Sequence, residues 1–153
     1  MAMDLDAVKV GFPQAVPMVS TLSLEFGDLD LQHAQMSMPD QQAYHNHVGG
    51  PHAGAMFTLA ESASGALVLA NFGDRLEDAT PLAVEATIRY LKLAMGPVTA
   101  TARMMRSGEE ILAELDSGGR PEFLVEIDLA TADGTVTGQM TIVWTLKPNK
   151  RSN

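Results

Sequence analysis

The sequence predicts an α+β fold in which an antiparallel sheet of five or six strands wraps around one long central helix. The helix is predicted by residues 51–72, a run with a single formally charged side chain, Glu61, that is long enough for about six turns. The strands are predicted mainly from residue 84 onward, where apolar and polar residues alternate with the period of two that half-buried antiparallel strands show.

The segments on either side of the helix complete the sheet. Residues 21–38 predict one or two strands before it, with a turn near Gly27-Asp28. Asp133-Gly134 predicts the turn of a hairpin between the last two strands. Segment 107–119 predicts a short helix capped by Ser107. The central helix is apolar on all sides, so the sheet must curl around it to bury both. This architecture is the hotdog fold.

The length of 153 residues and the 46% hydrophobic composition suit one domain with a sizeable core. We expect an N-terminal arm over residues 1–20, a single hotdog domain over 21–148 and a frayed tail over 149–153. The N-terminus has acids where a secretion signal has bases, and purely apolar runs are far shorter than the ~20 residues of a membrane span. These features predict a cytoplasmic protein that does not bind membranes.

The formal charge limits the possible partners. It is −9, from 19 acidic and 10 basic residues, and such a field repels phosphate backbones, so we expect no nucleic-acid partner. The chain has no cysteine, which excludes disulfides, a cysteine nucleophile and thiolate metal ligands. Exposed edges of the predicted sheet favour pairing in a homodimer, with a dimer of dimers as the larger alternative.

Glu61 is the first candidate for chemistry, because it lies in the middle of the least polar segment of the chain. A buried carboxylate needs hydrogen-bonding partners, an opening to a cavity or a raised pKa, and each of these also suits a catalytic base. The structural alternative is a carboxylate that caps a neighbouring loop or forms an ion pair with Arg89 or Arg103.

Polar residues gather immediately before the helix, in the segment Tyr44 to His52 (YHNHVGGPH). A helix N-terminus presents free amides, so those near Ala53 and Gly54 are candidates to bind a developing oxyanion. A plain turn into the helix explains the two glycines equally well. The histidines at 33, 45, 47 and 52 offer zinc ligands, but their spacing matches no strong metal signature, so we expect no metal.

The segment NHVGGPHAGAMFTLAESASG resembles the helix-start signature of PaaI-like hotdog thioesterases, N-x-x-G-x-x-H-G-G-x-x-x-x-x-x-D/E. The positions in register are Asn46, Gly49, His52, Gly54 and Glu61. The variants HAGA and AESASG look more like the subgroup known as a domain of unknown function with a hotdog fold.

The resemblance implies a role for each matched residue. Glu61 would be the general base or nucleophile, the Ala53 and Gly54 amides would bind the thioester oxygen, and Asn46 would orient the water or the carbonyl. His52 would hold the loop. In this family the site lies between two subunits, with the acid from one and the asparagine region from the other, and no cofactor is needed.

Two residues depart from the family pattern. Ala53 replaces the first glycine of H-G-G, which is tolerable because only its amide is used, and Ala83 stands where a serine or threonine is often found on the following strand. Substrate contacts are expected from Gly49, His52, Ala83 and Arg89.

The sequence therefore predicts an enzyme that hydrolyses acyl-CoA-type thioesters. The alternative is a non-catalytic hotdog protein that binds an acyl thioester as a sensor or carrier partner. A hydratase is disfavoured, because it requires an acid and a histidine close together after a strand, and all four histidines precede Glu61.

Overall fold

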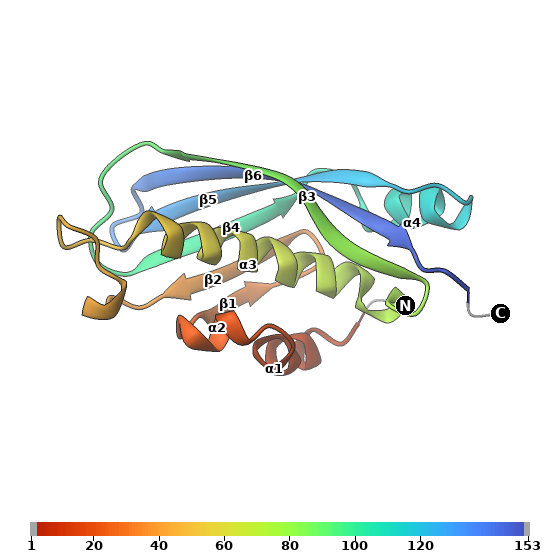
Figure 1. Ribbon diagram of the computed structural model, residues 1–153, viewed down its shortest axis with the longest axis horizontal. Coiled ribbons are helices and arrows are strands. Elements are labelled where there is room, and N and C mark those ends of the chain that lie inside the picture. Colours follow the sequence, from red (N-terminus) through yellow and green to blue (C-terminus); the bar gives the residue numbers. More distant parts are fainter. Residues whose placement is uncertain (1–2, 152–153) are drawn as a thin grey trace.

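The structure is a computed structural model in which residues 3–151 are described (Figure 1). Twelve elements follow one another along the chain: α1 (Leu5–Ala15), α2 (Pro17–Thr21), β1 (Glu25–Leu29), β2 (His33–Met38), the 3₁₀ turn η1 (Gln42–Tyr44), α3 (Ala53–Phe72), the 3₁₀ turn η2 (Gly73–Arg75), β3 (Ala79–Tyr90), β4 (Val98–Met104), α4 (Gly108–Asp116), β5 (Glu122–Thr131) and β6 (Val136–Pro148).

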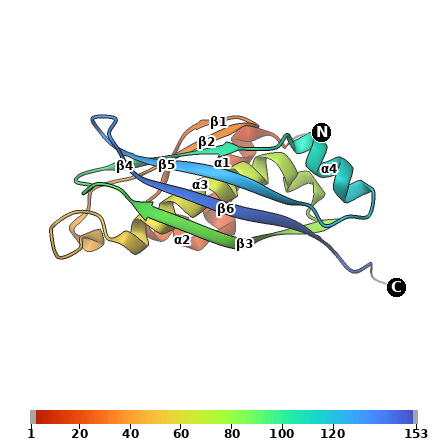
Figure 2. The ribbon, with the colours of Figure 1, turned by 90° about the horizontal axis from the view of Figure 1, so that it is seen from above.

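The six strands form one antiparallel sheet in the order β1-β2-β4-β5-β6-β3. The sheet curls around α3, as Figures 1 and 2 show, so the predicted hotdog fold is confirmed. Residues such as Leu59, Ala63 and Leu67 of α3 are fully buried against side chains of the sheet. The helix contains glycines and β-branched residues of low helix propensity, so this packing stabilises it more than its own propensity does.

The start of α3 differs slightly from the prediction. The helix begins at Ala53, and Pro51 lies outside it in an isolated bridge with His45. Within residues 3–151, one helical segment, Ala53–Arg75, is long and apolar enough to cross a bilayer by length and composition alone. Here the sheet covers it, so its apolar side chains form the core of the domain.

The N-terminal segment, expected as an irregular arm or a short helix, forms two helices, α1 and α2. Asp4 caps α1 by accepting the amide of Asp6 at 3.0 Å, and Phe12 is buried in the core. The ring of Phe12 packs edge-on against Phe26 of β1 with centroids 5.9 Å apart. A Cβ atom at Gly65 of α3 would lie 3.6 Å from the Phe12 ring, an ordinary van der Waals contact, so α1 packs directly against the central helix. Residues 1 and 2 lie outside the described range.

The C-terminal strand ends in an anchored residue. Asn149 donates its amide to Asp78 and its side chain to the carbonyls of Leu76 and Glu77, and it accepts from Thr80. Asn149, expected at the start of the frayed tail, is thus held by four hydrogen bonds. Residues 152 and 153 of that tail lie outside the described range. Both ends of the described chain lie at the end of the molecule opposite the first turn of α3 (Figure 1).

Side chains fix the turns of the sheet. The β1–β2 turn follows Asp30, whose carboxylate accepts the amides of Gln32 and His33 at 2.7 Å each, and not Gly27-Asp28, which lies within β1. The β5–β6 turn occurs at Asp133-Gly134 as predicted, with Gly134 at φ +84°. An aspartate that accepts amides two or three residues ahead stabilises a turn in this way.

Candidate active site

The loop before α3 is organised by Asn46. Its Oδ1 accepts the amides of Val48 and Gly50 at 3.0 and 3.1 Å, and its Nδ2 donates to the carbonyl of Pro51 at 3.4 Å. Gly49 follows with a left-handed φ of +78°. The Asn46 side chain therefore supports the loop, and one amide hydrogen of Nδ2 remains for a ligand.

The backbone of the loop also approaches the segment after β3 closely. A Cβ atom at Gly50 would lie 2.4 Å from the carbonyl oxygen of Ala94, so only glycine fits there. This contact holds the start of α3 beside the end of β3. The glycine pair of the motif thus has two separate causes, a left-handed backbone at Gly49 and a close approach at Gly50.

His52 is the N-cap of α3. Its Nδ1 accepts the amide of Gly54 at 2.8 Å, so the ring carries no proton on that nitrogen. The Gly54 amide, expected to bind the substrate, is therefore already used within the helix cap. The amides of Ala53 and Ala55 donate to no group in the part of the chain that the structure describes, which leaves Ala53 as the available member of the predicted pair.

Glu61 lies two turns into α3, between the buried residues Ala60 and Ser62. Its side chain is only partly exposed, and burial raises its pKa above the ordinary value. Among residues 3–151, no hydrogen bond or ion pair engages its carboxylate. The structural alternative fails for Arg103, because that guanidinium pairs with Glu126 and Asp128.

Strand β3 places the two remaining candidates on opposite faces. Ala83 pairs with the core residue Trp144 and so faces α3, whereas Arg89 pairs with the exposed Gln139 on the outer face of the sheet. Trp144 in turn donates its indole N–H to Ser64, one turn after Glu61. The fold thus places Ala83 on the face of the sheet that packs against α3 and Glu61. Arg89 lies on the opposite face, away from Ala83 and Glu61.

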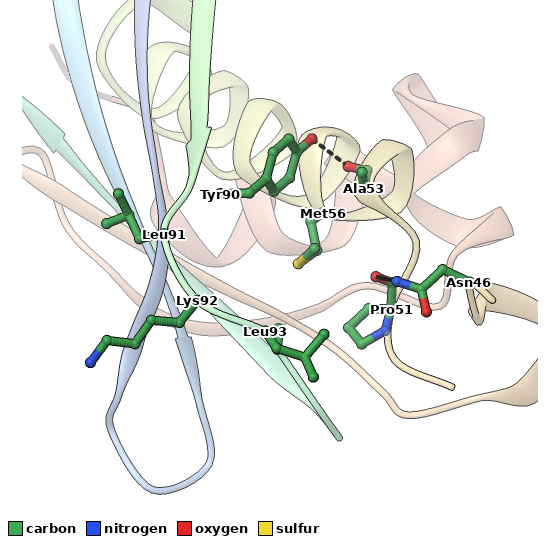
Figure 3. Close-up of a pocket in the computed structure, with 9 residues that line it drawn as sticks. Asn46, Pro51, Ala53, Met56, Tyr90, Leu91, Lys92 and Leu93 are labelled. Carbon is green, nitrogen blue, oxygen red and sulfur yellow. Dashed lines mark hydrogen bonds between the residues drawn. The ribbon is translucent and has the colours of Figure 1, made fainter. Parts of the chain in front are cut away.

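A cavity of about 390 Å³ opens at the first turn of α3, between the loop and the end of β3 (Figure 3). Tyr90 reaches across it and donates its hydroxyl to the carbonyl of Ala53 at 2.9 Å. We call this space the amide cavity, and its lining comprises Asn46, Pro51, Ala53, Met56, Tyr90, Leu91, Lys92, Leu93 and Ala94. Glu61 is not part of this lining.

Three of the four histidines, His33, His45 and His52, make separate local contacts, and His52 is the helix cap described above. His45 contacts Asp40 at 2.6 Å, and His33 lies 3.6 Å from Asp30. Within the described residues, no group of three or more histidine and acidic side chains is arranged to hold a metal ion. The histidine-rich segment instead supplies the helix cap at His52 and a loop contact at His45.

The family model for a domain of unknown function, DUF4442, matches residues 5–146. The chain belongs to the DUF4442 family. This agrees with the resemblance of its helix-start segment to the unknown-function subgroup of hotdog proteins. No curated protein matches this DUF4442 chain.

Solved structures resemble the DUF4442 chain over nearly its whole length. A Pseudomonas aeruginosa protein of unknown function, described as a probable thioesterase, is 26% identical with a TM-score of 0.84, and the match covers 97% of this chain and 99% of that one. Another P. aeruginosa protein, called a thioesterase, is 23% identical with a TM-score of 0.76 and 97% coverage of both chains. A thioesterase family protein from Silicibacter pomeroyi is 21% identical, with a TM-score of 0.75 and coverage of 95% and 100%. The last two show the likeness of fold.

Tyr90 was not predicted as part of the DUF4442 site. Tyr90 ends an alternating strand, and in the sequence it reads as one more core-facing residue. Its hydrogen-bond partner is the backbone carbonyl of Ala53, and a backbone partner cannot be recognised from the residue types in the sequence. The spatial contact between residues 90–94 and the start of α3 depends on tertiary structure, and only the unusual Gly49-Gly50 pair hinted at a close approach.

Proposed function

We propose that this chain hydrolyses acyl-CoA-type thioesters with Glu61 as the catalytic carboxylate. The observation that carries the proposal is the partly buried carboxylate of Glu61, which lies in an otherwise apolar helix and has no partner among residues 3–151. A carboxylate that is desolvated and lacks a partner is costly to the fold, and catalytic bases have these properties. The family membership and the thioesterase descriptions of similar structures support the same activity.

Two copies of the chain would complete one site. Glu61 follows Ala53 by eight residues, which separates them by about 12 Å along the helix axis, too far for both to reach one carbonyl group. Strand β3 is an edge strand with exposed Leu82 and Val84, and its free edge can pair with the same strand of a second copy. We infer that Glu61 of one subunit faces the amide cavity of its partner.

At this shared site the free amide of Ala53 binds the thioester oxygen and stabilises the negative charge that develops on it. In one route Glu61 takes a proton from water while the water oxygen bonds to the carbonyl carbon. The C–S bond then breaks, and the thiolate takes up the proton. In the other route a Glu61 oxygen bonds to that carbon, the thiolate leaves, and water opens the resulting anhydride.

The activity is tested by thiol release from a panel of acyl-CoA esters. We expect turnover by the parent chain and a loss of at least ~100-fold in kcat for Glu61→Gln, because the amide can neither accept the proton nor attack. Glu109→Gln is the matched control, since Glu109 is an exposed acid in the first turn of α4. Full activity of Glu61→Gln would remove Glu61 from the mechanism.

The shared site has its own test. Ala53→Pro deletes the amide hydrogen but suits the first position of a helix, and His52 has the extended backbone that a following proline requires. We expect Ala53→Pro and Glu61→Gln to be inactive alone. Mixed under conditions that exchange subunits, they should regain about a quarter of the parent activity, because half of the dimers then contain one intact site. If no activity returns, the Glu61 carboxylate and the Ala53 amide do not come from different subunits of a shared site.

Ala83 favours a second candidate function, binding without turnover. The methyl group of Ala83 offers no hydroxyl at the position where family members often carry one. A non-catalytic acyl-thioester-binding protein would show a thermal shift with acyl-CoA esters but release no thiol. We expect thiol release, and Ala83→Ser is expected to increase its rate if the hydroxyl contributes to turnover in this chain.

A further inference from the structure

A second cavity lies next to the amide cavity and has the same volume, about 390 Å³. Lys92 and Leu93 line both cavities, so they form the wall between them. Figure 3 shows Leu93 directed toward Pro51 and Lys92 directed away from it. We call the second space the lysine cavity, and its other lining residues are Met95, Thr131, Ala132, Asp133, Thr135 and Thr137.

Lys92 is the one cation that lines either cavity. Three arginines, Arg75, Arg103 and Arg106, are paired with carboxylates, whereas Lys92 has no ion pair among the described residues. In a chain of net charge −9, an unpaired ammonium group beside the candidate site provides a local positive field.

Thr137 supplies a second, independent sign of a ligand. Thr137 is only 3% exposed. Its hydroxyl is the one buried side-chain oxygen or nitrogen without a hydrogen-bond partner within residues 3–151. Its carbonyl accepts the amides of Leu91 and Lys92 at 2.9 and 3.1 Å, which fixes Lys92 beside it. Burying an unpaired hydroxyl opposes folding, and an acceptor in the cavity would satisfy it.

Asp133 is the opposing charge. Its Oδ1 accepts the Thr131 hydroxyl at 2.8 Å and the Thr135 amide at 3.0 Å, and these hydrogen bonds lower its pKa. Asp133 therefore stays charged and is held on the turn between β5 and β6. The Asp133 carboxylate reduces the affinity of the lysine cavity for an anion, but it forms no ion pair with the Lys92 ammonium group among the described contacts.

We propose that the lysine cavity binds the phosphate of the 4′-phosphopantetheine arm that carries the acyl group. Lys92 pairs with the phosphate, and Thr137 donates its hydroxyl to a phosphate oxygen. The pantetheine chain passes over Leu93 from the thioester in the amide cavity. This inference rests on the proposed thioesterase function and adds the residues that recognise the substrate arm, which CoA and acyl carrier proteins share.

The test compares two thioesters with the same acyl group, acyl-pantetheine and acyl-4′-phosphopantetheine, which differ by one phosphate. We expect the parent chain to prefer the phosphorylated ester in kcat/KM. Lys92→Met keeps the apolar stem and should raise KM for that ester on the order of tenfold, and we expect a much smaller change in KM for acyl-pantetheine. The matched control is Lys147→Met, an exposed lysine near the end of β6. Equal effects on both esters, or none, would overturn the proposal.

Thr137→Val separates binding from folding. Removal of the unpaired hydroxyl should raise the unfolding temperature, and the same change should reduce the preference for the phosphorylated ester. Asp133→Asn should increase that preference, because a repulsive charge is removed. A Thr137→Val chain that keeps the full preference would exclude the hydroxyl from the site.

Two further comparisons complete the test. Hydrolysis rates with acyl-CoA and with the acylated form of acyl carrier protein show which carrier uses the cavity. A raised KM of Lys92→Met for either substrate supports the proposal. If the parent chain hydrolyses none of these thioesters, acyl-CoA esters included, the proposed function fails. The phosphate site is then judged by thermal shift with free 4′-phosphopantetheine against pantetheine. A larger shift with the phosphorylated compound that Lys92→Met abolishes supports the site, and equal shifts overturn it.

Discussion

The hydroxyl of Tyr90 donates to the carbonyl oxygen of Ala53 at 2.9 Å and thereby joins the end of β3 to the first turn of α3. Ala53 also supplies the free amide of the amide cavity. Its carbonyl is therefore held by a residue of the sheet, while its N–H remains available to a ligand. The bond spans two elements that are far apart in the sequence. Tyr90 therefore acts as a positioning residue for the helix start.

Tyr90→Phe removes this bond and keeps the ring. We expect a stability loss of about 1 kcal/mol and a severalfold fall in kcat, because the first turn of α3 is then less firmly held. Denaturant unfolding and thiol release measure the two effects. Tyr44→Phe is the matched control, since the Tyr44 hydroxyl also donates to a backbone carbonyl, that of Thr21, at 3.4 Å. A fall in kcat of the same size in both variants would contradict a specific role for Tyr90.

The rate of thioester hydrolysis should depend on pH through Glu61. Burial raises the pKa of this carboxyl above its ordinary value of 4.5, and the ionised form is the one that acts as base or nucleophile. We expect kcat/KM to rise with pH and to level off, with an inflection above pH 4.5. The residual rate of Glu61→Gln should lack this inflection, and an inflection retained in that variant would assign it to another group.

Stability should show the opposite dependence on pH. Because the pKa of Glu61 is raised in the folded chain, the folded state holds the proton more tightly, and stability falls as pH rises through the raised value. Glu61→Gln should therefore unfold at a higher temperature than the parent at neutral pH, with Tm gaining ~2–4 °C per kcal/mol. The gain should vanish below pH 4.5, where both states are protonated. A Tm lowered at neutral pH would contradict this.

Variants of His52 can separate helix capping from contact with substrate. His52→Ala loses the Gly54 bond and should cost about 1 kcal/mol of stability, whereas His52→Asn restores an N-cap acceptor. If His52 acts only on the helix start, thiol release should recover together with stability in His52→Asn. A stable His52→Asn chain with a large loss of kcat/KM would instead show that the imidazole contacts the substrate.

The two glycines before α3 should respond differently to alanine. Gly50→Ala places a methyl group 2.4 Å from the Ala94 carbonyl and should cost roughly 3 kcal/mol or more, because two backbone segments must separate. Gly49→Ala has open space but a φ of +78°, so its cost should be about 1 kcal/mol. Chemical denaturation of both variants measures the difference, and equal costs would contradict the close contact.

The sequence predicted the elements that have a regular pattern of apolar and polar residues. The apolar run around Glu61 identified the central helix, and the alternation after residue 84 identified the sheet around it. The turn at Asp133-Gly134 and the cap at Ser107 were predicted because each depends on side chains close in sequence. The expected turn at Gly27-Asp28 was wrong because Asp30 binds two amides and fixes the turn later.

The site was only partly predictable. The motif identified Glu61, Asn46 and His52, but their hydrogen bonds depend on the folded loop, which directs Asn46 and His52 to the backbone. Arg89 was expected at the substrate, and strand alternation after the bulge between Ala83 and Glu85 places it on the outer face. Tyr90 joins the lining of the amide cavity through packing between distant segments, which spacing in the sequence does not show.

Both ends of the described chain lie at the end of the molecule away from the first turn of α3, and Asn149 anchors the end of β6. A fluorescent label, affinity tag or surface tether attached beyond Asn149 would therefore leave the amide cavity unobstructed. The same arrangement would let a fusion partner be appended at the C-terminus without changing the hydrogen bonds between β6 and its neighbours β5 and β3.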